Sequence, residues 1–357
     1  MSSKLKILLF AVVLISAISM YYIFAILSSS SFESTGTALA RNPEGGVVVS
    51  GYYRGSDYGL INAMRTNTPR YDVISYFFEC SDFREPEFIL AEQSYCYSND
   101  LLITSDRNLY YCGVHWGFSF ATDHFGLTVN DTSKFSWDAY IEKFNRDSRT
   151  DWFHLFGGTG IDSMQGITSV DSDIYAMGYF MNSCDFGNDT QGYRIEKSSN
   201  GAYDAFICRL SDDGLLKNVV SWGGVGDDFG LAIESDSNEH FYVAGYFEDR
   251  VMLPEGTEEL EVVSRGDADC LLIKFDAAMQ GRWSRTWGGP GTDNCTSAAI
   301  SRDGDIYICG YFSESISQTL GNTELNLRAV EERDAYCARF SPEGDLLWFS
   351  PWGGTSN

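Results

Sequence analysis

The sequence predicts an all-β protein, a five-bladed β-propeller with four antiparallel strands per blade, because three landmarks recur about every 65 residues. A Gly stands beside aromatic residues, a Gly-Gly pair closes an aromatic-rich run, and an Asp opens an apolar run. The first landmark falls at Gly51, Gly113, Gly178, Gly245 and Gly310, the second starts at Gly157, Gly223, Gly288 and Gly353, and the third falls at Asp72, Asp138, Asp204, Asp269 and Asp334. Because three independent landmarks keep one period, the chain is interpreted as a repeat protein.

The composition agrees with many short strands and tight turns. The chain has 24 Phe, 21 Tyr, 8 Trp and 35 Gly in 357 residues, a mixture typical of sheets rather than helical bundles. Asp and Glu number 50 against 25 Lys and Arg, which gives a net charge of −25. This charge repels phosphate backbones, so we expect no nucleic-acid partner.

An export signal is expected at the start of the chain. Residues Ile7 to Leu27 are apolar and carry no charge, and they follow Lys4 and Lys6. A run of this length spans a bilayer as a helix, and the preceding lysines place the body in the periplasm or outside the cell. Residues 1–35 are therefore assigned to a signal anchor with a short tether. The alternative is a signal peptide cleaved after Ala17-Ile18-Ser19, which releases a secreted protein.

Each period is expected to hold four strands. Residues 36–357 form the propeller, with blades at about 36–96, 97–157, 158–222, 223–287 and 288–357. In the last period the strand-like runs are Thr296 to Ser301, Asp305 to Phe312, Asp334 to Phe340 and Leu346 to Trp352. Trp283 and Trp287 are four residues apart, so they share one face of a strand and can pack against the next blade.

Two kinds of segment can connect neighbouring blades. The first is the joint GGxGxD, seen from Gly157 to Asp162, and the second is the long segment between the second and third strands of a period. If the joint connects the blades, five complete blades close without strand exchange, which is the arrangement that we predict. If the long segment connects them, the last strand has to complete the first blade.

The pattern from Asp204 to Phe247, in which WGGxGxD is followed by YVAGYF, resembles the SBBP type of bacterial β-propeller repeat. The resemblance is strong in the last three periods and weak in the first. It implies a propeller and an exported location. That family has no established catalytic motif, so the resemblance implies no catalytic residue.

Two sets of charged residues recur with the repeat. Asp162, Asp228 and Asp293 end the GGxGxD joints, where a ring of carboxylates near the central channel can hold a cation such as calcium. The alternative is that each Asp accepts hydrogen bonds from amides of its own turn. A basic row is formed by Lys143, Arg209, Lys274 and Arg339. It is interpreted as protection of an outer strand against edge pairing, with anion binding as the alternative.

The cysteines and histidines give no metal or redox motif. Cys112, Cys309, Cys208 and Cys337 lie inside predicted strands and are expected to be small buried apolar residues. No CxxC pair occurs, which argues against a zinc or redox site, and the four histidines are scattered. Cys80 and Cys96 are a candidate disulfide in an exported protein. No cofactor is predicted.

The long segments between the second and third strands are the least alike parts of the repeats, and variable segments on a rigid scaffold are where binding usually resides. The alternative is that they are solvated excursions with strands of their own. They are Arg54 to Tyr71, Gly117 to Ser136, Met181 to Tyr203, Glu248 to Ala268 and Ser313 to Arg333.

These observations favour a membrane-anchored, extracytoplasmic scaffold that binds a protein or glycan ligand, or mediates adhesion, without catalysis. Two alternatives remain. One is a carbohydrate-active hydrolase with carboxylates at the channel, which needs two carboxylates in unlike environments. The other is a purely structural envelope protein.

Overall fold

The protein is all-β over the residues that the computed structural model describes, which are 33–41, 47–54, 73–80, 87–93, 96–116, 136–144 and 150–354. No helix occurs within these ranges, and neighbouring strands of every sheet run antiparallel. The predicted anchor at Ile7 to Leu27 lies outside them. Within the described ranges, no helix has the length and apolar character needed to cross a bilayer.

The strands form five four-stranded units, here called sheets 1 to 5. Sheet 1 contains β1 (Glu33–Arg41), β2 (Val47–Arg54), β3 (Val73–Cys80) and β4 (Glu87–Gln93). Sheet 2 contains β5 (Cys96–Ile103), β6 (Leu109–Trp116), β7 (Trp137–Phe144) and β8 (Thr150–Gly158). Sheet 3 contains β9 (Ser163–Val170), β10 (Asp173–Asn188), β11 (Arg194–Leu210) and β12 (Leu216–Gly224). Sheet 4 contains β13 (Phe229–Ser235), β14 (His240–Met252), β15 (Glu261–Asp276) and β16 (Gly281–Trp287). Sheet 5 contains β17 (Asn294–Ile300), β18 (Ile306–Leu320), β19 (Thr323–Phe340) and β20 (Leu346–Trp352).

Strands pair in the order in which they occur, so the GGxGxD joints connect the last strand of one sheet to the first strand of the next. The predicted connection of neighbouring units by this joint is confirmed. Short ladders also join sheets 2, 3 and 4. Gly157 and Gly158 pair with β10, and Gly223 and Gly224 pair with β14.

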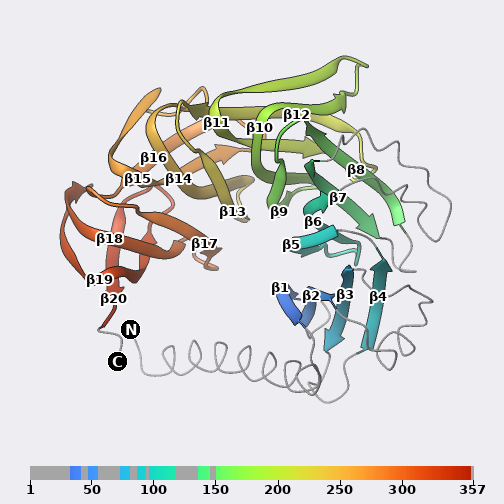
Figure 1. Cartoon of the computed structure of the whole chain (residues 1–357), viewed down its shortest axis with the longest axis horizontal. Coiled ribbons are helices and arrows are strands. Elements are labelled where there is room, and N and C mark those ends of the chain that lie inside the picture. Colours follow the sequence, from blue (N-terminus) through green and yellow to red (C-terminus); the bar gives the residue numbers. More distant parts are fainter. Residues whose placement is uncertain are drawn as a thin grey trace.

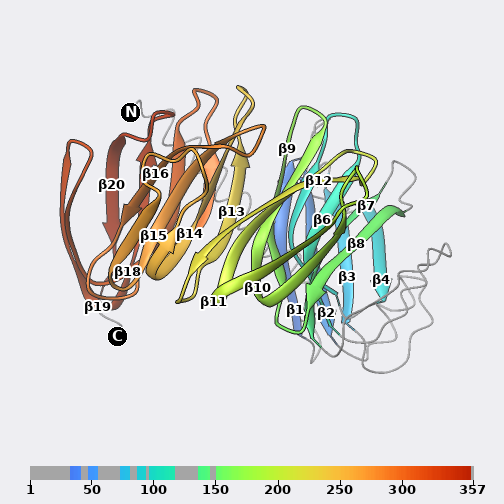
Figure 2. The same ribbon diagram turned by 90° about the horizontal axis from the view of Figure 1, so that it is seen from above.

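The five sheets follow one another around an arc (Figure 1). Their first strands, β1, β5, β9, β13 and β17, lie on the inner side of this arc, and consecutive first strands contact each other. Figure 2 shows the same strands from above, with sheet 5 at the left side of the view. Strand pairing does not join sheets 1 and 5 among the described residues, so closure of the ring stays a prediction.

Three of the long variable segments are hairpin arms rather than loops. β10 and β11 continue as a ladder from Ser183↔Ser198 to Asn188↔Arg194, beyond a bulge that follows Met181. The second arm extends β14 and β15, and the third extends β18 and β19. These arms confirm that the segments carry strands of their own. The two earlier segments lie almost wholly outside the described residues.

The start of the first strand differs from the expectation. β1 begins at Glu33, whereas the sequence predicted a tether up to residue 35 and a first strand that begins near Gly36. In the last period, β20 agrees with the predicted strand from Leu346 to Trp352. β18 and β19 are longer than predicted because the arm continues them.

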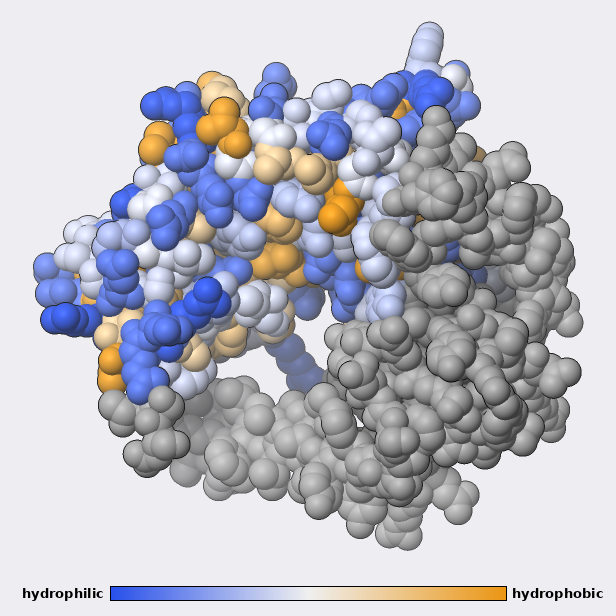
Figure 3. Space-filling model, in the orientation of Figure 1, coloured by the Kyte–Doolittle hydropathy of each residue, from blue (hydrophilic) through white to orange (hydrophobic). Residues whose placement is uncertain are grey.

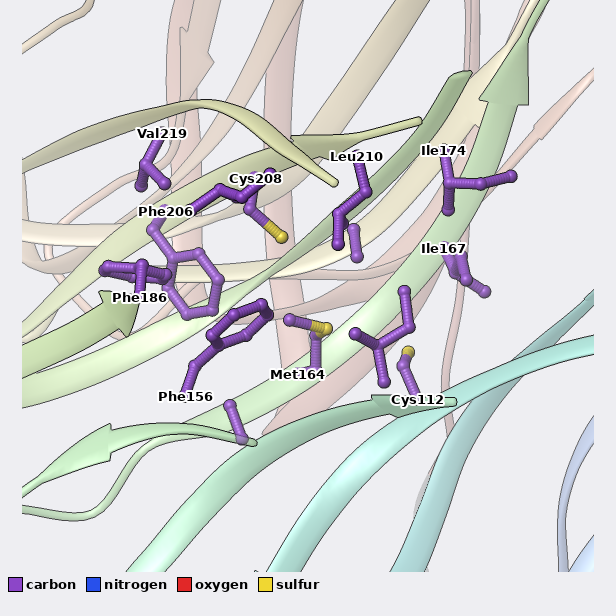
Figure 4. Packing of buried hydrophobic residues seen from close by; sticks show 14 of the residues in the cluster. Cys112, Phe156, Met164, Ile167, Ile174, Phe186, Phe206, Cys208, Leu210 and Val219 are labelled. Carbon is purple, nitrogen blue, oxygen red and sulfur yellow. The ribbon is translucent and has the colours of Figure 1, made fainter. Parts of the chain in front are cut away.

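The apolar core lies between successive sheets. Figure 4 shows the layer between sheets 2 and 3, where Cys112 and Phe156 of sheet 2 meet Met164, Phe186 and Phe206 of sheet 3. Equivalent layers lie between sheets 3 and 4 and between sheets 4 and 5. The predicted packing of Trp283 and Trp287 against the next sheet is confirmed, since both are buried in the layer shared with sheet 5. Each layer removes large apolar side chains from water, which is the main favourable term in folding.

The side of the molecule drawn in Figure 3 is mainly hydrophilic where its residues are described, with hydrophobic residues scattered over it. Exposed residues such as Leu215, Val225 and Val330 come from different sheets. Single exposed apolar residues of this kind are normal on soluble surfaces.

The Gly-Gly pair is explained by two close approaches. A Cβ at Gly157 would collide with the carboxylate of Asp138, and a Cβ at Gly158 would collide with the carbonyl oxygen of Ser183 in the next sheet's arm. The later joints repeat both collisions. Glycine is required here because the backbone of one sheet touches a side chain of its own sheet and the backbone of the next.

Candidate binding groove between sheets 3 and 4

The boundary between sheets 2 and 3 is closed by three side chains of sheet 2 that reach one turn of sheet 3. Lys143 Nζ donates to the Asp212 carboxylate at 2.7 Å and to its carbonyl oxygen at 2.9 Å. Trp152 Nε1 also donates to the Asp212 carbonyl, at 2.9 Å, and His154 Nε2 lies 2.6 Å from the carbonyl oxygen of Gly214. The Lys143 side chain is buried, whereas that of Asp212 is about half exposed.

The boundary between sheets 4 and 5 repeats this arrangement. Lys274 Nζ and Trp283 Nε1 donate to the carbonyl oxygen of Pro342 at 3.0 and 3.2 Å. Arg285 Nε donates to the carbonyl oxygen of Gly344 at 2.9 Å. At both boundaries a cationic side chain, an indole and a third nitrogen-bearing side chain therefore contact carbonyl oxygens in one turn of the next sheet.

The boundary between sheets 3 and 4 departs from this pattern. In β16 the strand register pairs Lys274 with Trp283 and Leu272 with Arg285. The same register in β12 pairs Arg209 with Asn218 and Ile207 with Val220. Asn218 and Val220 thus stand where sheets 2 and 4 have an indole and a second nitrogen-bearing side chain, His154 or Arg285.

The cation of sheet 3 is also directed elsewhere. Arg209 forms an ion pair with Asp173 of its own sheet at 2.5 Å, and Lys217 contacts the same carboxylate at 2.5 Å. Tyr175 still reaches across the boundary, since its hydroxyl donates to the carbonyl oxygen of Ala277 at 2.7 Å. Of the two smaller residues, Val220 borders open space at this boundary.

A groove of about 360 Å³ occupies this boundary. Its lining residues come from four segments, namely Lys197 and Asn200 of β11, Val219 to Gly223 of β12, Met252 to Glu255 at the tip of the sheet 4 arm, and Met279 and Gln280 of the next turn. Trp222 and Met279 form a buried apolar floor, whereas Met252 is 53% exposed at the rim. The rim adds an amine, a carboxylate and two amides, so the groove offers an apolar surface with polar groups around it.

The edge of β12 lies along this groove. On the side opposite β11, β12 pairs at its ends, where Leu216 meets Asp189 and the Gly223–Gly224 pair meets β14. Among the described residues no strand pairs with the segment between these ends on that side. Unpaired backbone groups of an edge strand are a template for an added strand.

The arm tip that walls the groove is held in place. Gly281 N donates to the carbonyl oxygen of Glu255 at 2.9 Å, and Leu253 N donates to that of Leu260 at 2.9 Å. Thr257 Oγ1 donates to the carbonyl oxygen of Pro254 at 2.9 Å. The wall is therefore preformed by backbone contacts.

The three candidate cation ligands lie in separate joints and are buried. Asp162 accepts hydrogen bonds from Gly158 N at 3.1 Å and Met181 N at 3.2 Å, and Asp293 accepts them from the equivalent amides of Gly289 and Ser313 at 2.6 and 3.2 Å. Asp228 accepts one from Gly224 N at 2.6 Å. These bonds match the alternative in which each Asp caps its own joint. The described ranges contain no cluster of three or more His, Cys, Asp or Glu residues suited to a metal ion.

Each joint nevertheless contains two neighbouring carboxyl groups. Burial, with a contribution from nearby Asp138, raises the pKa of Asp162 to about 8 despite two amide hydrogen bonds that lower it. Burial, with a contribution from Asp204, raises the pKa of Asp228 to about 8. Burial likewise raises the pKa of Asp293 to about 7, with Asp269 as its acidic neighbour. Because these side chains are buried, the hydrolase alternative gains no support from them.

The interpretation of the basic row as edge protection was wrong. The row lies on β7, β11, β15 and β19, each of which pairs with a strand on both sides. Lys143 and Lys274 instead seal boundaries between sheets, and Arg209 and Arg339 pair with Asp173 and Asp305. A strand's position in its sheet depends on long-range pairing, which the row itself did not reveal.

The cysteine predictions hold in part. Cys112 and Cys208 are buried as expected, but Cys309 is exposed and Cys337 is half-buried. This difference arises because the outward face of sheet 5 has no described sheet against it. The side chains of the candidate pair Cys80 and Cys96 lie outside the described part.

The groove was missed at the sequence level, although a signal was present. The strand before each Gly-Gly pair carries Trp152, Trp283 or Trp348 four residues ahead of a second aromatic residue, whereas β12 carries Asn218 there. Two of the four groove segments, those with Lys197 and Met252, lie in the variable segments where binding was expected.

Comparison with known proteins shows no family for this chain. No protein-family model matches it. The regulatory protein FlaEY of Caulobacter vibrioides is 22% identical over 188 residues, a match that spans 53% of this chain and 19% of that protein. The chain thus spans about a fifth of the length of this curated relative. A crystal structure of a protein of unknown function from Dyadobacter fermentans matches with a TM-score of 0.45 and 10% identity, covering 90% of this chain and 94% of that one. The resemblance to SBBP-type repeats stays a prediction.

Proposed function

We propose that the protein is an exported β-propeller scaffold that binds an extended peptide segment of a partner protein in the groove between sheets 3 and 4. One observation carries the proposal. At this boundary Asn218 and Val220 replace the residues that fill the flanking boundaries, and Val220 lines an open groove of about 360 Å³.

The chemistry of the groove favours a peptide with an aromatic side chain. An indole occupies the corresponding position at both flanking boundaries, where it donates to a turn carbonyl. A partner's aromatic ring is of a size to enter the groove beside Trp222 and Met279. The adjoining edge of β12 can pair with the partner's backbone, as in β-strand addition. Lys197 and Glu255 at the rim supply charges of both signs for side chains beside the anchor.

The proposed scaffold is a closed propeller in which sheet 1 packs against the outward face of sheet 5. That face resembles the buried faces of sheets 3 and 4, since Trp352 pairs with Ala335 as Trp222 pairs with Ala205 and Trp287 with Cys270. In the described arc Trp352 is 54% exposed. If the ring closes, Trp352→Ala lowers the free energy of unfolding by about 3 to 5 kcal/mol, as expected for a buried indole. A loss below about 1 kcal/mol, measured by urea denaturation, argues for an open arc.

The proposed location follows from the sequence. The run from Ile7 to Leu27 is long enough to anchor the chain in a membrane, with the scaffold outside the cytoplasm. Fusion of a reporter enzyme that works only outside the cytoplasm to the last residue tests this location. An inactive fusion that is present in full amount contradicts it.

Peptide binding is tested with the full chain purified in detergent. A phage-displayed library of random dodecapeptides is selected on the immobilised chain, and the enriched peptides are titrated by fluorescence anisotropy. We expect enriched sequences to share an aromatic residue. The variant Asn218→Trp/Val220→Arg, which installs the residues of β16, should weaken their binding at least tenfold because it fills the groove.

The matched control is Ser350→Arg. Ser350 pairs with Cys337 in sheet 5 as Val220 pairs with Ile207 in sheet 3, so this change adds the same side chain outside the groove and should leave binding unchanged. Equal binding by the groove-filling variant contradicts the proposed site. Selection of no peptide, together with binding on a glycan array, replaces the peptide with a carbohydrate ligand and overturns the proposal.

A further inference from the structure

Two thiols face each other on the outward side of sheet 5. The antiparallel register of β18 and β19 places Cys309 directly opposite Cys337, and their sulfur atoms are 3.2 Å apart. Directly opposed residues of an antiparallel pair have Cα atoms about 4.5 to 5.5 Å apart. A disulfide spans about 4.4 to 6.8 Å between Cα atoms, so the backbone already has the required separation.

This pair is a departure from the repeat. The corresponding opposed residues are Cys112 with Ile141, Met177 with Ile207 and Ala244 with Leu272. All six of those residues are buried. Sheet 5 is the only described sheet with two cysteines at these positions.

The approach to the pair is open in the described arc. In the proposed closed ring sheet 1 covers this face, so the pair reacts before sheet 1 packs against sheet 5. Cys309 is exposed and Cys337 is half-buried. Their neighbours across the sheet are Ser297 on β17 and Ser350 on β20, which are both small and exposed. By contrast, the other five cysteines whose side chains are described are buried and removed from oxidants.

We propose that Cys309 and Cys337 are a redox-active pair that closes to a cross-strand disulfide when the exported chain meets a disulfide oxidant. The Cys309 thiolate attacks one sulfur of the oxidant and releases its first thiol. The Cys337 thiolate then attacks the Cys309 sulfur of this mixed disulfide and releases the second thiol. Two protein thiols and one oxidant disulfide thus become one protein disulfide and two small thiols.

The electrostatics agree with the order of attack. The hydrogen bond between the two sulfurs lowers the pKa of Cys309 to about 7, and it raises the pKa of Cys337. A thiol with a pKa near ambient pH is the effective attacking group in exchange reactions. Cys309 is therefore the first nucleophile and Cys337 the resolving thiol.

Formation of the disulfide in cells rests on the proposed exported location, whereas its formation in the purified chain does not. Two measurements separate these cases. In the first, the full chain is purified in reduced form and incubated with oxidised glutathione in urea below the unfolding midpoint, so that sheet 1 can separate from sheet 5 while the other boundaries stay folded. Free thiols are then alkylated, and the unreduced protein is digested and mapped by mass spectrometry. We expect a peptide pair linked through Cys309 and Cys337. Cys337→Ser should instead give a glutathione adduct on Cys309, and Cys112→Ser should leave the linked peptide unchanged.

In the second measurement, the full chain is produced with its own N-terminal segment, and thiols are trapped by acid and alkylation in intact cells. The same linked peptide is expected. Two alkylated thiols, or glutathione on both cysteines, in the purified chain overturn the redox pair. If the purified chain gives the linked peptide but cells give two free thiols, the redox pair is supported. The proposed exposure of the pair to an oxidising compartment is then overturned.

Discussion

The boundaries on either side of sheet 4 differ although they are built from equivalent strands. Toward sheet 5, Trp283 and Arg285 of β16 reach the carbonyl oxygens of Pro342 and Gly344 and fill the space between the sheets. Toward sheet 3, Asn218 and Val220 occupy the equivalent positions of β12, and Val220 lines the groove. Positions that repeat hold the scaffold together, whereas a position that departs from the repeat opens a site. Three predictions test this comparison, beginning with the largest expected effect.

Breaking the filled boundary should be costly. Trp287 is fully buried between sheets 4 and 5, and its indole contacts the Tyr336 and Phe340 rings. Trp287→Ala should therefore lower the free energy of unfolding by about 3 to 5 kcal/mol, because it removes a large apolar side chain and leaves a cavity. Urea denaturation followed by circular dichroism gives this value. Asn218→Ala at the groove should change it by less than about 0.5 kcal/mol, since Asn218 is exposed. A similar loss for both variants contradicts the comparison.

The joint between sheets 3 and 4 should make stability depend on pH. Burial raises the pKa of Asp228 from 3.8 to about 8, so the unfolded chain ionises near pH 4 while the folded joint keeps its proton. The unfolded state is therefore increasingly favoured as pH rises from about 4 to about 8. Between these pH values, the free energy of unfolding of the Asp228→Asn chain should fall by about 2 to 4 kcal/mol less than that of the wild type. This range allows for the coupled Asp204 carboxyl.

Urea midpoints of the wild-type and Asp228→Asn chains at pH 5 and pH 8 measure this difference. Asp303→Asn, which changes a surface carboxyl in a turn of sheet 5, is the control and should keep the wild-type decline. If the Asp228→Asn chain loses as much stability between the two pH values as the wild type, the buried joint is not the source.

Filling the groove should have the smallest effect on stability. Asn218→Trp/Val220→Arg gives β12 the residues of β16, and it should raise the free energy of unfolding by about 0.5 to 2 kcal/mol by filling space between sheets 3 and 4. The reverse change, Trp283→Asn/Arg285→Val, should destabilise the chain. Thermal unfolding of both variants checks these signs. Stabilisation by the reverse change contradicts the idea that the two boundaries differ in packing.

Much of the scaffold could be predicted from residues close together in the sequence. The alternation along Asp334 to Phe340 and the Gly-Gly pairs predicted strands and joints, because side-chain direction in a strand and the space beside a glycine are local properties. The arms were harder to predict. Their strands, such as those that extend β14 and β15, bury only a few apolar residues on one face, among them Val251 and Val262, so the period-2 signal is weak.

The sequence by itself determined a repeating all-β chain, since each unit carries its own strand pattern, but it left open whether the GGxGxD joint or the long segment connects neighbouring units. The tertiary structure decided which residues of different units meet. Lys143 contacts Asp212, Val220 and Met279 line one groove, and Cys309 faces Cys337 without any CxxC spacing. These encounters depend on strand register and on packing between sheets, which bring together residues that lie far apart along the chain.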